Sequence, residues 1–197
     1  MIPRSVVAAT TLAFLLAGCG SPIVKAGLSR FAGTPGTATV QPASGAPEIW
    51  LTLPQRGVKF TMSLLEQDGP VTVWAAKDGS QVVLRNGFLI STRGFGRDLM
   101  SAEAPSLATL TSGQAHQRSY FDLDGTDTTI RHSFTCTVEP GDKAAEMPGT
   151  RHVIEACAAE IGTIRNEFWI DSAGSLRKSK QWVSQGVGYA AVERKLD

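Results

Sequence analysis

The chain has 197 residues, of which 42% are hydrophobic and 19% are charged, and its formal net charge at pH 7 is +1. This length suits one domain with a sizeable core. The near-neutral charge argues against a basic nucleic-acid-binding protein.

The first eighteen residues have the organisation of a bacterial signal peptide. Arg4 supplies a positive charge, and the apolar run over residues 6–16 has the length of a signal-peptide core but is too short to span a bilayer. The run ends in Leu16-Ala17-Gly18-Cys19, which resembles the lipobox of bacterial lipoproteins. This resemblance implies cleavage before Cys19 and acylation of its thiol. The alternative is an ordinary secretory signal with an incidental cysteine.

The residues after Cys19 indicate where the acylated protein is held. Two or more acyl chains give lasting membrane attachment, whereas one chain binds only marginally. Gly20 and Ser21 follow the cysteine in place of the Asp that retains lipoproteins at the inner membrane of enteric bacteria, so we expect anchoring at the periplasmic face of the outer membrane. A short helix is expected within residues 20–32. The predicted parts are a signal peptide (1–18), a lipidated N-terminus with a flexible Gly- and Pro-rich tether (19–47) and an all-β domain (48–197).

From residue 49 onward, apolar side chains recur at every second position. Ile49, Leu51 and Leu53 show this period, which is typical of a strand with one buried face. Three two-residue turns separate the next apolar runs, namely Asp68-Gly69, Asp78-Gly79 and Asn86-Gly87. We therefore expect an antiparallel meander with strands at about 58–66, 71–76, 80–85 and 88–92.

Residues 93–115 interrupt this period, and we expect a short helix near residues 106–110 there. Alternation then resumes, and the remaining strands are expected at about 120–123, 130–138, 163–171, 175–184 and 188–194, with one more that begins after the 140–149 loop. A sheet of about ten strands usually curls into a barrel or splits into a sandwich, because open edges invite aggregation. The predicted fold class is all-β, an antiparallel meander that is barrel-like or a sandwich, with a short N-terminal helix.

Two cysteines remain after Cys19, and they are Cys136 and Cys157. Export places them in an oxidising compartment, where a disulfide is the default, and closing a loop of about 20 residues stabilises by ~3 kcal/mol. If they pair, the flanking strands form a hairpin. Two unpaired buried thiols are the alternative. A metal site is disfavoured because no CxxC or paired-His spacing accompanies them, and no cofactor is predicted.

The chain carries no recognisable catalytic motif: GxSxG, HExxH and P-loop patterns are all absent from the sequence. His132 lies on the apolar face of its predicted strand and is interpreted as a core residue, whereas His116 and His152 are interpreted as surface residues. Asp122 and Asp124 are interpreted as flanking a turn rather than as a catalytic carboxylate pair. We therefore assign no catalytic residue and predict that the protein is not an enzyme.

Residues 91–100 form the densest polar stretch and are the first candidate contact surface. Arg93 and Arg97 offer forked donors that suit an anionic sugar or a partner loop. Phe95 and Asp98 complete this candidate set. The alternative is a tight loop with solvated charges.

The tryptophans are the other candidate recognition groups, because aromatic faces stack on sugars and fill protein interfaces. They are Trp50, Trp74, Trp169 and Trp182. Trp74 and Trp169 fall on the polar side of their strands if the neighbouring aliphatic residues face the core. Burial beneath a helix or loop is the alternative for both.

The sequence resembles the YjbF/GfcB lipoprotein family, which is linked to group 4 capsule and exopolysaccharide production. The residues that carry the resemblance are Leu53-Pro54, Val73-Trp74-Ala75 and the stretch 86–100, with Gly94-Phe95-Gly96-x-Asp98-Leu99 at its centre and the lipobox in addition. The resemblance implies an antiparallel meander barrel and a role in secreting or assembling a surface polysaccharide beside outer-membrane barrel proteins. No catalytic residues carry over.

Three functional hypotheses follow. The first is a non-enzymatic accessory that docks an outer-membrane β-barrel of an exopolysaccharide export system, or contacts the polysaccharide, through residues 91–100 and exposed aromatics. The second is a carrier of a lipid or lipid-linked glycan, which needs an apolar cavity of at least ~300 Å³. The third is a polysaccharide hydrolase, which needs two carboxylates within ~10 Å across a groove.

Overall fold

The computed structural model describes residues 42–126 and 128–195. The predicted signal peptide, the acylation site at Cys19, the helix within residues 20–32 and most of the tether lie outside the described residues. Among the helices that are described, none combines the length and the apolar character needed to cross a bilayer.

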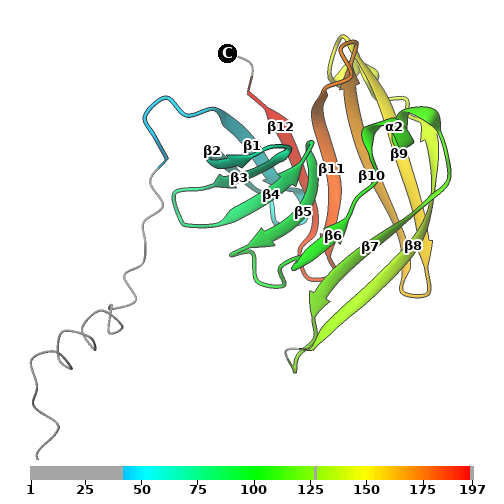
Figure 1. The fold of residues 1–197 in the computed structure, drawn as a ribbon, viewed down its shortest axis with the longest axis horizontal. Helices are drawn as coiled ribbons and strands as arrows, with labels where there is room; N and C mark the ends of the chain where they lie inside the picture. Colours follow the sequence, from blue (N-terminus) through cyan, green and yellow to red (C-terminus); the bar gives the residue numbers. More distant parts are fainter. Residues whose placement is uncertain (1–41, 127, 196–197) are drawn as a thin grey trace, which may run out of the picture. The chain divides into compact units, whose positions relative to one another are not determined.

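One antiparallel sheet of twelve strands makes up the described domain (Figure 1). The strands are β1 (Glu48–Leu53), β2 (Val58–Asp68), β3 (Val71–Ala75), β4 (Gln81–Arg85), β5 (Phe88–Arg93), β6 (Ser101–Glu103), β7 (His116–Leu123), β8 (Thr129–Pro140), β9 (Thr150–Ala159), β10 (Gly162–Asp171), β11 (Leu176–Ser184) and β12 (Gly188–Arg194). The short helices are η1 (Pro54–Arg56), α2 (Leu107–Ser112) and η2 (Ala144–Glu146). The predicted all-β meander is confirmed, with twelve strands rather than about ten. Strand β6 went unpredicted because three residues are too few to show a period.

The strand order explains how the sheet curls. It runs β5-β4-β3-β2-β1-β12-β11-β10-β9-β8-β7-β6, so β1 pairs with β12 and the two edge strands are β5 and β6. These edges are consecutive in the chain and lie beside each other (Figure 1). The Thr92 amide donates to the Leu99 carbonyl at 2.9 Å across this seam. The sheet is therefore a nearly closed barrel and not a sandwich of two sheets.

The two-residue period correctly identified the inward face of several strands. Ile49, Leu51 and Leu53 of β1 are all at most 1% exposed. They belong to a large core cluster that also includes Met62, Val82, Leu89, Phe134 and Trp182. A smaller cluster contains Leu110 of α2 together with Phe88, Val153, Phe168, Ile170 and Leu176. Helix α2 thus packs its one fully buried residue against strands β9 to β11.

The β4–β5 turn is held against β11 across the interior. Gly87 has a φ of 85°, and a Cβ atom there would lie 2.9 Å from Cδ2 of Leu176, so both the turn and the packing require glycine. The Gln181 side chain accepts from the Leu89 amide at 3.1 Å and donates to the Gly87 carbonyl at 3.2 Å. These contacts tie the first five strands to the later half of the sheet.

Strands β8 and β9 form the predicted hairpin, joined by the predicted disulfide. Cys136 lies directly opposite Cys157 in the strand register, and their sulfur atoms are bonded. Both residues are buried. The disulfide prediction is confirmed.

Candidate functional site

The predicted contact loop, residues 91–100, lies at the seam of the barrel, where it comprises the end of β5 and the connection to β6. The Ser91 hydroxyl donates to the Leu99 carbonyl at 3.2 Å, and the Met100 amide donates to the Phe121 carbonyl of β7 at 2.9 Å. Leu99 is fully buried. The loop therefore closes the barrel as well as presenting side chains to solvent.

Asp98 organises this loop from within. Its Oδ1 accepts from the Thr92 hydroxyl at 2.9 Å and from the Phe95 amide at 3.1 Å, and its Oδ2 accepts from the Gly94 amide at 2.8 Å. Gly94 adopts a left-handed φ of 89°, close against Ser80, which brings its amide toward the carboxylate. Among the four candidate loop residues, Asp98 therefore uses its carboxylate for hydrogen bonds within the loop.

The other loop candidates divide into one buried and two exposed residues. Phe95 is buried and meets the Phe60 ring edge-on, with 5.7 Å between ring centroids. Arg93 and Arg97 are exposed. Arg93 lines a shallow depression of about 320 Å³ with Asp98, Met100 and neighbouring side chains of β4 and β5. The surface that this loop offers to a partner therefore consists of Arg93, Arg97 and Met100, which we call the seam surface.

Trp74 points inward, which reverses the orientation suggested by its strand. It lies opposite Val82, which is fully buried, and packs against the main core cluster. Its Nε1 donates to the Thr72 hydroxyl at 2.8 Å. Strand β3 has apolar residues on both faces, so alternation alone does not establish which face is inward.

Trp169 lies on the outward face, as predicted, but the loop that contains η2 covers it. Its Nε1 donates to the Lys143 carbonyl at 2.9 Å, and its ring stacks on His152 with 4.5 Å between centroids. The ring is buried. The alternative of burial beneath a loop therefore describes Trp169.

Inside the barrel lies a polar network that sequence patterns did not indicate. Glu155 of β9 is fully buried and accepts from His116 Nε2 at 2.7 Å, from Arg118 Nη1 at 2.8 Å and from Asn166 Nδ2 at 2.6 Å. Arg118 also donates to Gln181 Oε1 at 3.1 Å. These partners come from β7, β10 and β11, so only the strand register brings them together.

The charges in this network determine its protonation. Burial alone would raise the pKa of Glu155, but the Arg118 charge and the hydrogen bonds from His116 and Asn166 outweigh it and leave that pKa below its ordinary value. The hydrogen bond to Glu155 raises the pKa of His116, with burial opposing. Burial raises the pKa of Tyr120, beside Arg118, to about 12. A carboxylate held ionised by a buried guanidinium is not a proton donor at neutral pH, so Glu155 is not suited to act as a general acid.

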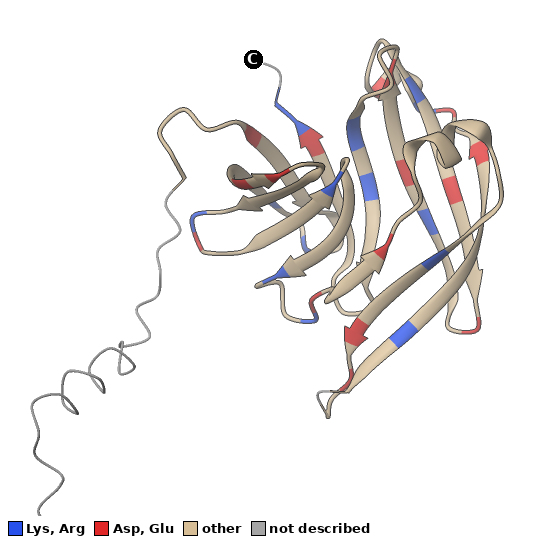
Figure 2. Ribbon diagram, in the orientation of Figure 1, with Lys and Arg blue, Asp and Glu red and all other residues tan. Residues whose placement is uncertain are grey.

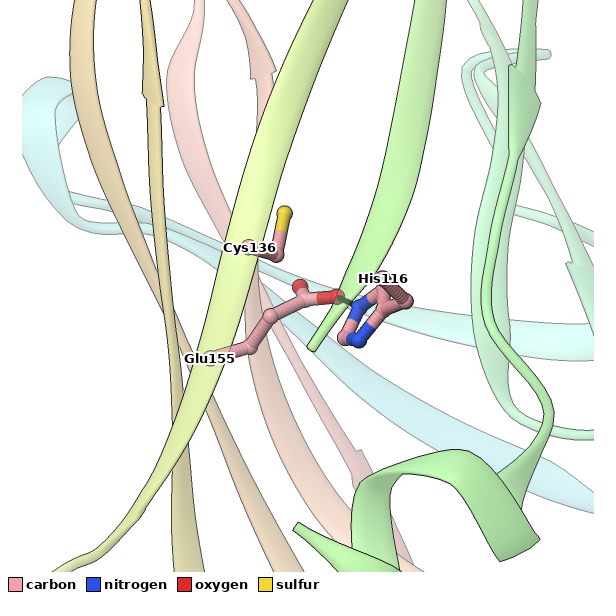
Figure 3. Close-up of side chains that lie close together, drawn as sticks. All are labelled: His116, Cys136 and Glu155. Atoms are coloured by element: carbon pink, nitrogen blue, oxygen red, sulfur yellow. Dashed lines mark hydrogen bonds and ion pairs between the residues drawn. The ribbon is translucent and has the colours of Figure 1, made fainter. Parts of the chain in front are cut away.

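One part of this network has the spacing of metal ligands. Figure 3 shows Glu155 directed toward His116, with Cys136 above them, and the potential ligand atoms of the three residues lie within 4.8 Å of one another. The Cys136 sulfur is bonded to Cys157, so it offers no thiolate to a metal. The oxidised protein therefore presents a disulfide beside an ion pair at this position.

A second polar cluster fastens the η2 loop to the outward face. His152 is buried, contrary to its interpretation as a surface residue, and His116 is half-buried. The Lys143 amide donates to His152 Nδ1 at 3.1 Å, so the His152 proton resides on Nε2, which donates to Glu167 Oε2 at 3.1 Å. The Lys143 ammonium also binds Glu167, at 2.9 Å. Sequence reasoning missed both histidines because their partners lie on other strands.

Asp124 lies at the β7–β8 turn, as interpreted, whereas Asp122 lies within β7 and binds a histidine of β8. Asp124 accepts from the amides of Thr126 and Thr128 and so caps the β7–β8 turn. Those hydrogen bonds lower the pKa of Asp124. Asp122 binds His132 at 3.0 Å.

Acidic and basic segments are interspersed along the strands (Figure 2), in agreement with the near-zero net charge.

The chain is similar to a known protein family and to a solved structure. A family model described as group 4 capsule polysaccharide lipoprotein gfcB, YjbF matches residues 38–194. Among solved structures, the hypothetical lipoprotein YmcC from Escherichia coli (K12) is similar with a TM-score of 0.63 and 18% sequence identity, over 91% of this chain and 98% of that chain. At that identity the likeness shows the fold alone. Among curated proteins, none matches the chain.

Proposed function

The chain belongs to the YjbF family of group 4 capsule polysaccharide lipoproteins, and from this premise we propose that it is a non-enzymatic accessory in the export or assembly of a capsule or exopolysaccharide. The observation that carries the proposal is the family match, which spans residues 38–194 and so includes every strand of the barrel. The buried acids at the centres of the two polar clusters are unsuited to act as general acids. Glu155 and Glu167 are each ion-paired, and each has a lowered pKa although burial acts to raise it.

The accessory acts at the periplasmic face of the outer membrane, held there by acyl chains on Cys19. The Leu16-Ala17-Gly18-Cys19 sequence at the end of the apolar run supports this anchor. We expect Cys19→Ser to move the protein from the membrane fraction to the soluble fraction and to reduce surface polysaccharide. Fractionation and mass spectrometry of the N-terminal peptide test this, and an unmodified Cys19 in the wild-type protein would remove the anchor from the proposal.

The seam surface docks an outer-membrane β-barrel of the export system. Its two guanidinium groups are exposed, one at the end of β5 and one in the loop that Asp98 organises by hydrogen bonds, so they suit acidic groups on a partner. Met100 is 49% exposed and adds an apolar contact beside the arginines.

The docking proposal is tested by the paired substitution Arg93→Gln with Arg97→Gln. We expect it to cut surface polysaccharide while the melting temperature stays at the wild-type value. Arg151→Gln with Arg165→Gln is the matched control, because both of these arginines are exposed and lie on β9 and β10, at least three strands away from β6. Normal polysaccharide from the seam variant would rule out the seam as the docking surface. A photo-crosslinker at position 100 should capture one β-barrel partner.

The pocket that reaches the barrel core is small, which favours the accessory over the lipid carrier. It is lined by core residues such as Ile49 and Leu84 and has a volume of about 50 Å³. Drug-sized ligands occupy pockets of roughly 300–1,000 Å³. A larger depression of about 800 Å³, beside Lys59 and Asp78, is open to solvent rather than enclosed, and charged as well as apolar side chains line it.

A further inference from the structure

The outward face of the sheet carries a second surface that the proposed docking does not use. A groove of about 320 Å³ is lined by Trp50, Asp171, Arg177, Glu193, Arg194 and the 147–150 segment after η2. We call it the Trp50 groove. It lies over β1, β12, β11 and the end of β10, whereas the seam surface lies between β5 and β6.

The register of four strands places the lining residues of this groove beside the residues that hold the η2 loop. Trp50 of β1 lies opposite Glu193 of β12, and Glu193 lies opposite Lys178 of β11, which in turn lies opposite Trp169 of β10. Lys178 is ion-paired with Glu146 of η2 at 3.2 Å, so the loop that borders the groove is tied to β11 beside it. The half-buried Trp50 ring lies at one side of the groove, and the 147–150 segment lies at the other.

A β-bulge places a guanidinium in the groove. Trp169 pairs with Lys178 and Ile170 pairs with Leu176, so Arg177 is an extra residue without a partner on β10. Bulges redirect side chains and are common beside functional sites. Arg177 is half-buried, and its Nη1 lies 3.9 Å from Asp171 Oδ2. The groove therefore contains an ion pair that offers both hydrogen-bond donors and acceptors.

The chemistry of the lining distinguishes between classes of ligand. An anion would meet two carboxylates, Asp171 and Glu193, and a cation would meet the guanidinium group of Arg177. A sugar hydroxyl both donates and accepts hydrogen bonds, so it can use both kinds of group at once. The apolar face of a sugar ring also suits an exposed aromatic ring.

The Trp50 ring remains available to a ligand. The Lys59 ammonium lies 4.2 Å from its centroid and that of Lys195 lies 5.7 Å away. Such contacts are weak at exposed sites, and Lys59 is exposed on a long flexible side chain, so a ligand ring can displace it.

We propose that the Trp50 groove is a saccharide-binding site, in which a sugar ring stacks on Trp50 and its hydroxyls bind Arg177, Asp171 and Glu193. The choice of ligand class rests on the proposed role in polysaccharide export. The groove would keep the polymer beside the accessory while the seam surface holds the export barrel.

The test is binding of oligosaccharides by the acylated full-length protein in lauryldimethylamine oxide, a detergent without a sugar headgroup. The probe is the exopolysaccharide of the bacterium that encodes the chain, cut by mild acid, and the readouts are saturation-transfer NMR and calorimetry. Trp50→Ala removes the stacking ring, and we expect it to raise the Kd about tenfold. Arg177→Gln should raise it by a similar factor.

Matched variants separate binding from folding. Trp50→Phe keeps a flat ring and should stay within about threefold of the wild-type Kd. Arg165→Gln removes an exposed arginine of β10 outside the groove and should leave the Kd unchanged. The groove is rejected if the wild-type protein binds no oligosaccharide, or if Arg177→Gln and Trp50→Ala, both melting at the wild-type temperature, bind as tightly as wild type. Surface polysaccharide produced with the seam variant is measured separately from oligosaccharide binding. The groove and the proposed function can therefore be rejected independently.

Discussion

Glu155 illustrates how much one residue depends on its neighbours in this barrel. Its two oxygens receive hydrogen bonds from His116, Arg118 and Asn166, and both Glu155 and Arg118 are fully buried. The Nε of Arg118 has no hydrogen-bond partner, so the guanidinium relies on Glu155 and Gln181 for its compensation. A buried charge that loses its partner is far more costly than an exposed one.

We expect Glu155→Gln to lower the free energy of unfolding by about 3–5 kcal/mol, because the substitution leaves the Arg118 charge buried without a counter-charge. Urea unfolding followed by circular dichroism measures this. Glu139→Gln is the control, since Glu139 pairs with Arg165 at the surface, where such pairs contribute ~0–1 kcal/mol. Equal losses in the two variants would contradict the assigned role of Glu155.

His116 makes the stability of this network depend on pH. The pKa of His116 is raised in the folded state, chiefly by its hydrogen bond to Glu155. Its stabilising contribution is therefore fully present below the unfolded pKa and is lost as the pH rises through the folded pKa. We expect His116→Gln to destabilise the protein more at about pH 5.5 than at about pH 8.5.

Urea unfolding of the wild-type protein and the His116→Gln variant at both pH values measures the difference. The lowered pKa of Glu155 acts in a separate range, because its contribution is lost only as the pH falls through the folded pKa of that carboxyl. A loss that is the same at both pH values would show that His116 does not titrate with a raised pKa.

At the scale of elements, the η2 loop depends on one close contact with β9. The Gly141 amide donates to the His152 carbonyl at 3.0 Å, and a Cβ atom at Gly141 would overlap the His152 ring. His152 in turn stacks on Trp169, whose Nε1 donates to the loop carbonyl of Lys143. The loop, the histidine and the tryptophan therefore form one packed unit.

We expect Gly141→Ala to destabilise the domain by about 1–3 kcal/mol, because an added methyl group forces the loop away from His152. The measurement is the shift in urea midpoint, together with acrylamide quenching of tryptophan fluorescence, which should rise as Trp169 becomes exposed. Gly125→Ala is the matched control, since a Cβ atom there meets no atom within 4 Å. An unchanged midpoint and unchanged quenching in Gly141→Ala would refute the packed unit.

At the scale of the whole domain, closure of the barrel depends on the seam between β5 and β6. The edge strands meet through residues 91–100, and Asp98 accepts three hydrogen bonds that shape this loop. Edge strands expose unpaired backbone groups, so a closed seam also protects the protein from association through its edges.

We expect Asp98→Ala to speed hydrogen exchange of the β5 and β6 amides about tenfold, because the loss of three hydrogen bonds favours local opening of the seam. Mass spectrometry of exchanged peptides measures this. Asp124→Ala also removes three hydrogen bonds, but at the β7–β8 turn, and serves as the control. Exchange that changes equally at the seam in both variants would show that Asp98 has no special part in closure.

The sequence predicted features that depend on neighbours along the chain. Alternation in β1 and the Asn86-Gly87 turn depend on the side-chain period and on the φ that each residue tolerates, and both are local. The exposure of Arg93 and Arg97 could be anticipated in the same way. The burial of Phe95 could not, because it results from contact with Phe60 on a distant strand.

By itself, the sequence determined the all-β meander, the pairing of Cys136 with Cys157 and the family resemblance, because each of these is written in local patterns or in a small number of cysteines. Only the tertiary structure decided that the sheet closes at residues 91–100, that Trp74 faces inward and that His116, Arg118 and Glu155 meet in the interior. The physical reason is that strand register and curling join residues far apart in the chain. A polar residue is recognised as buried and paired only when its partner on another strand is known.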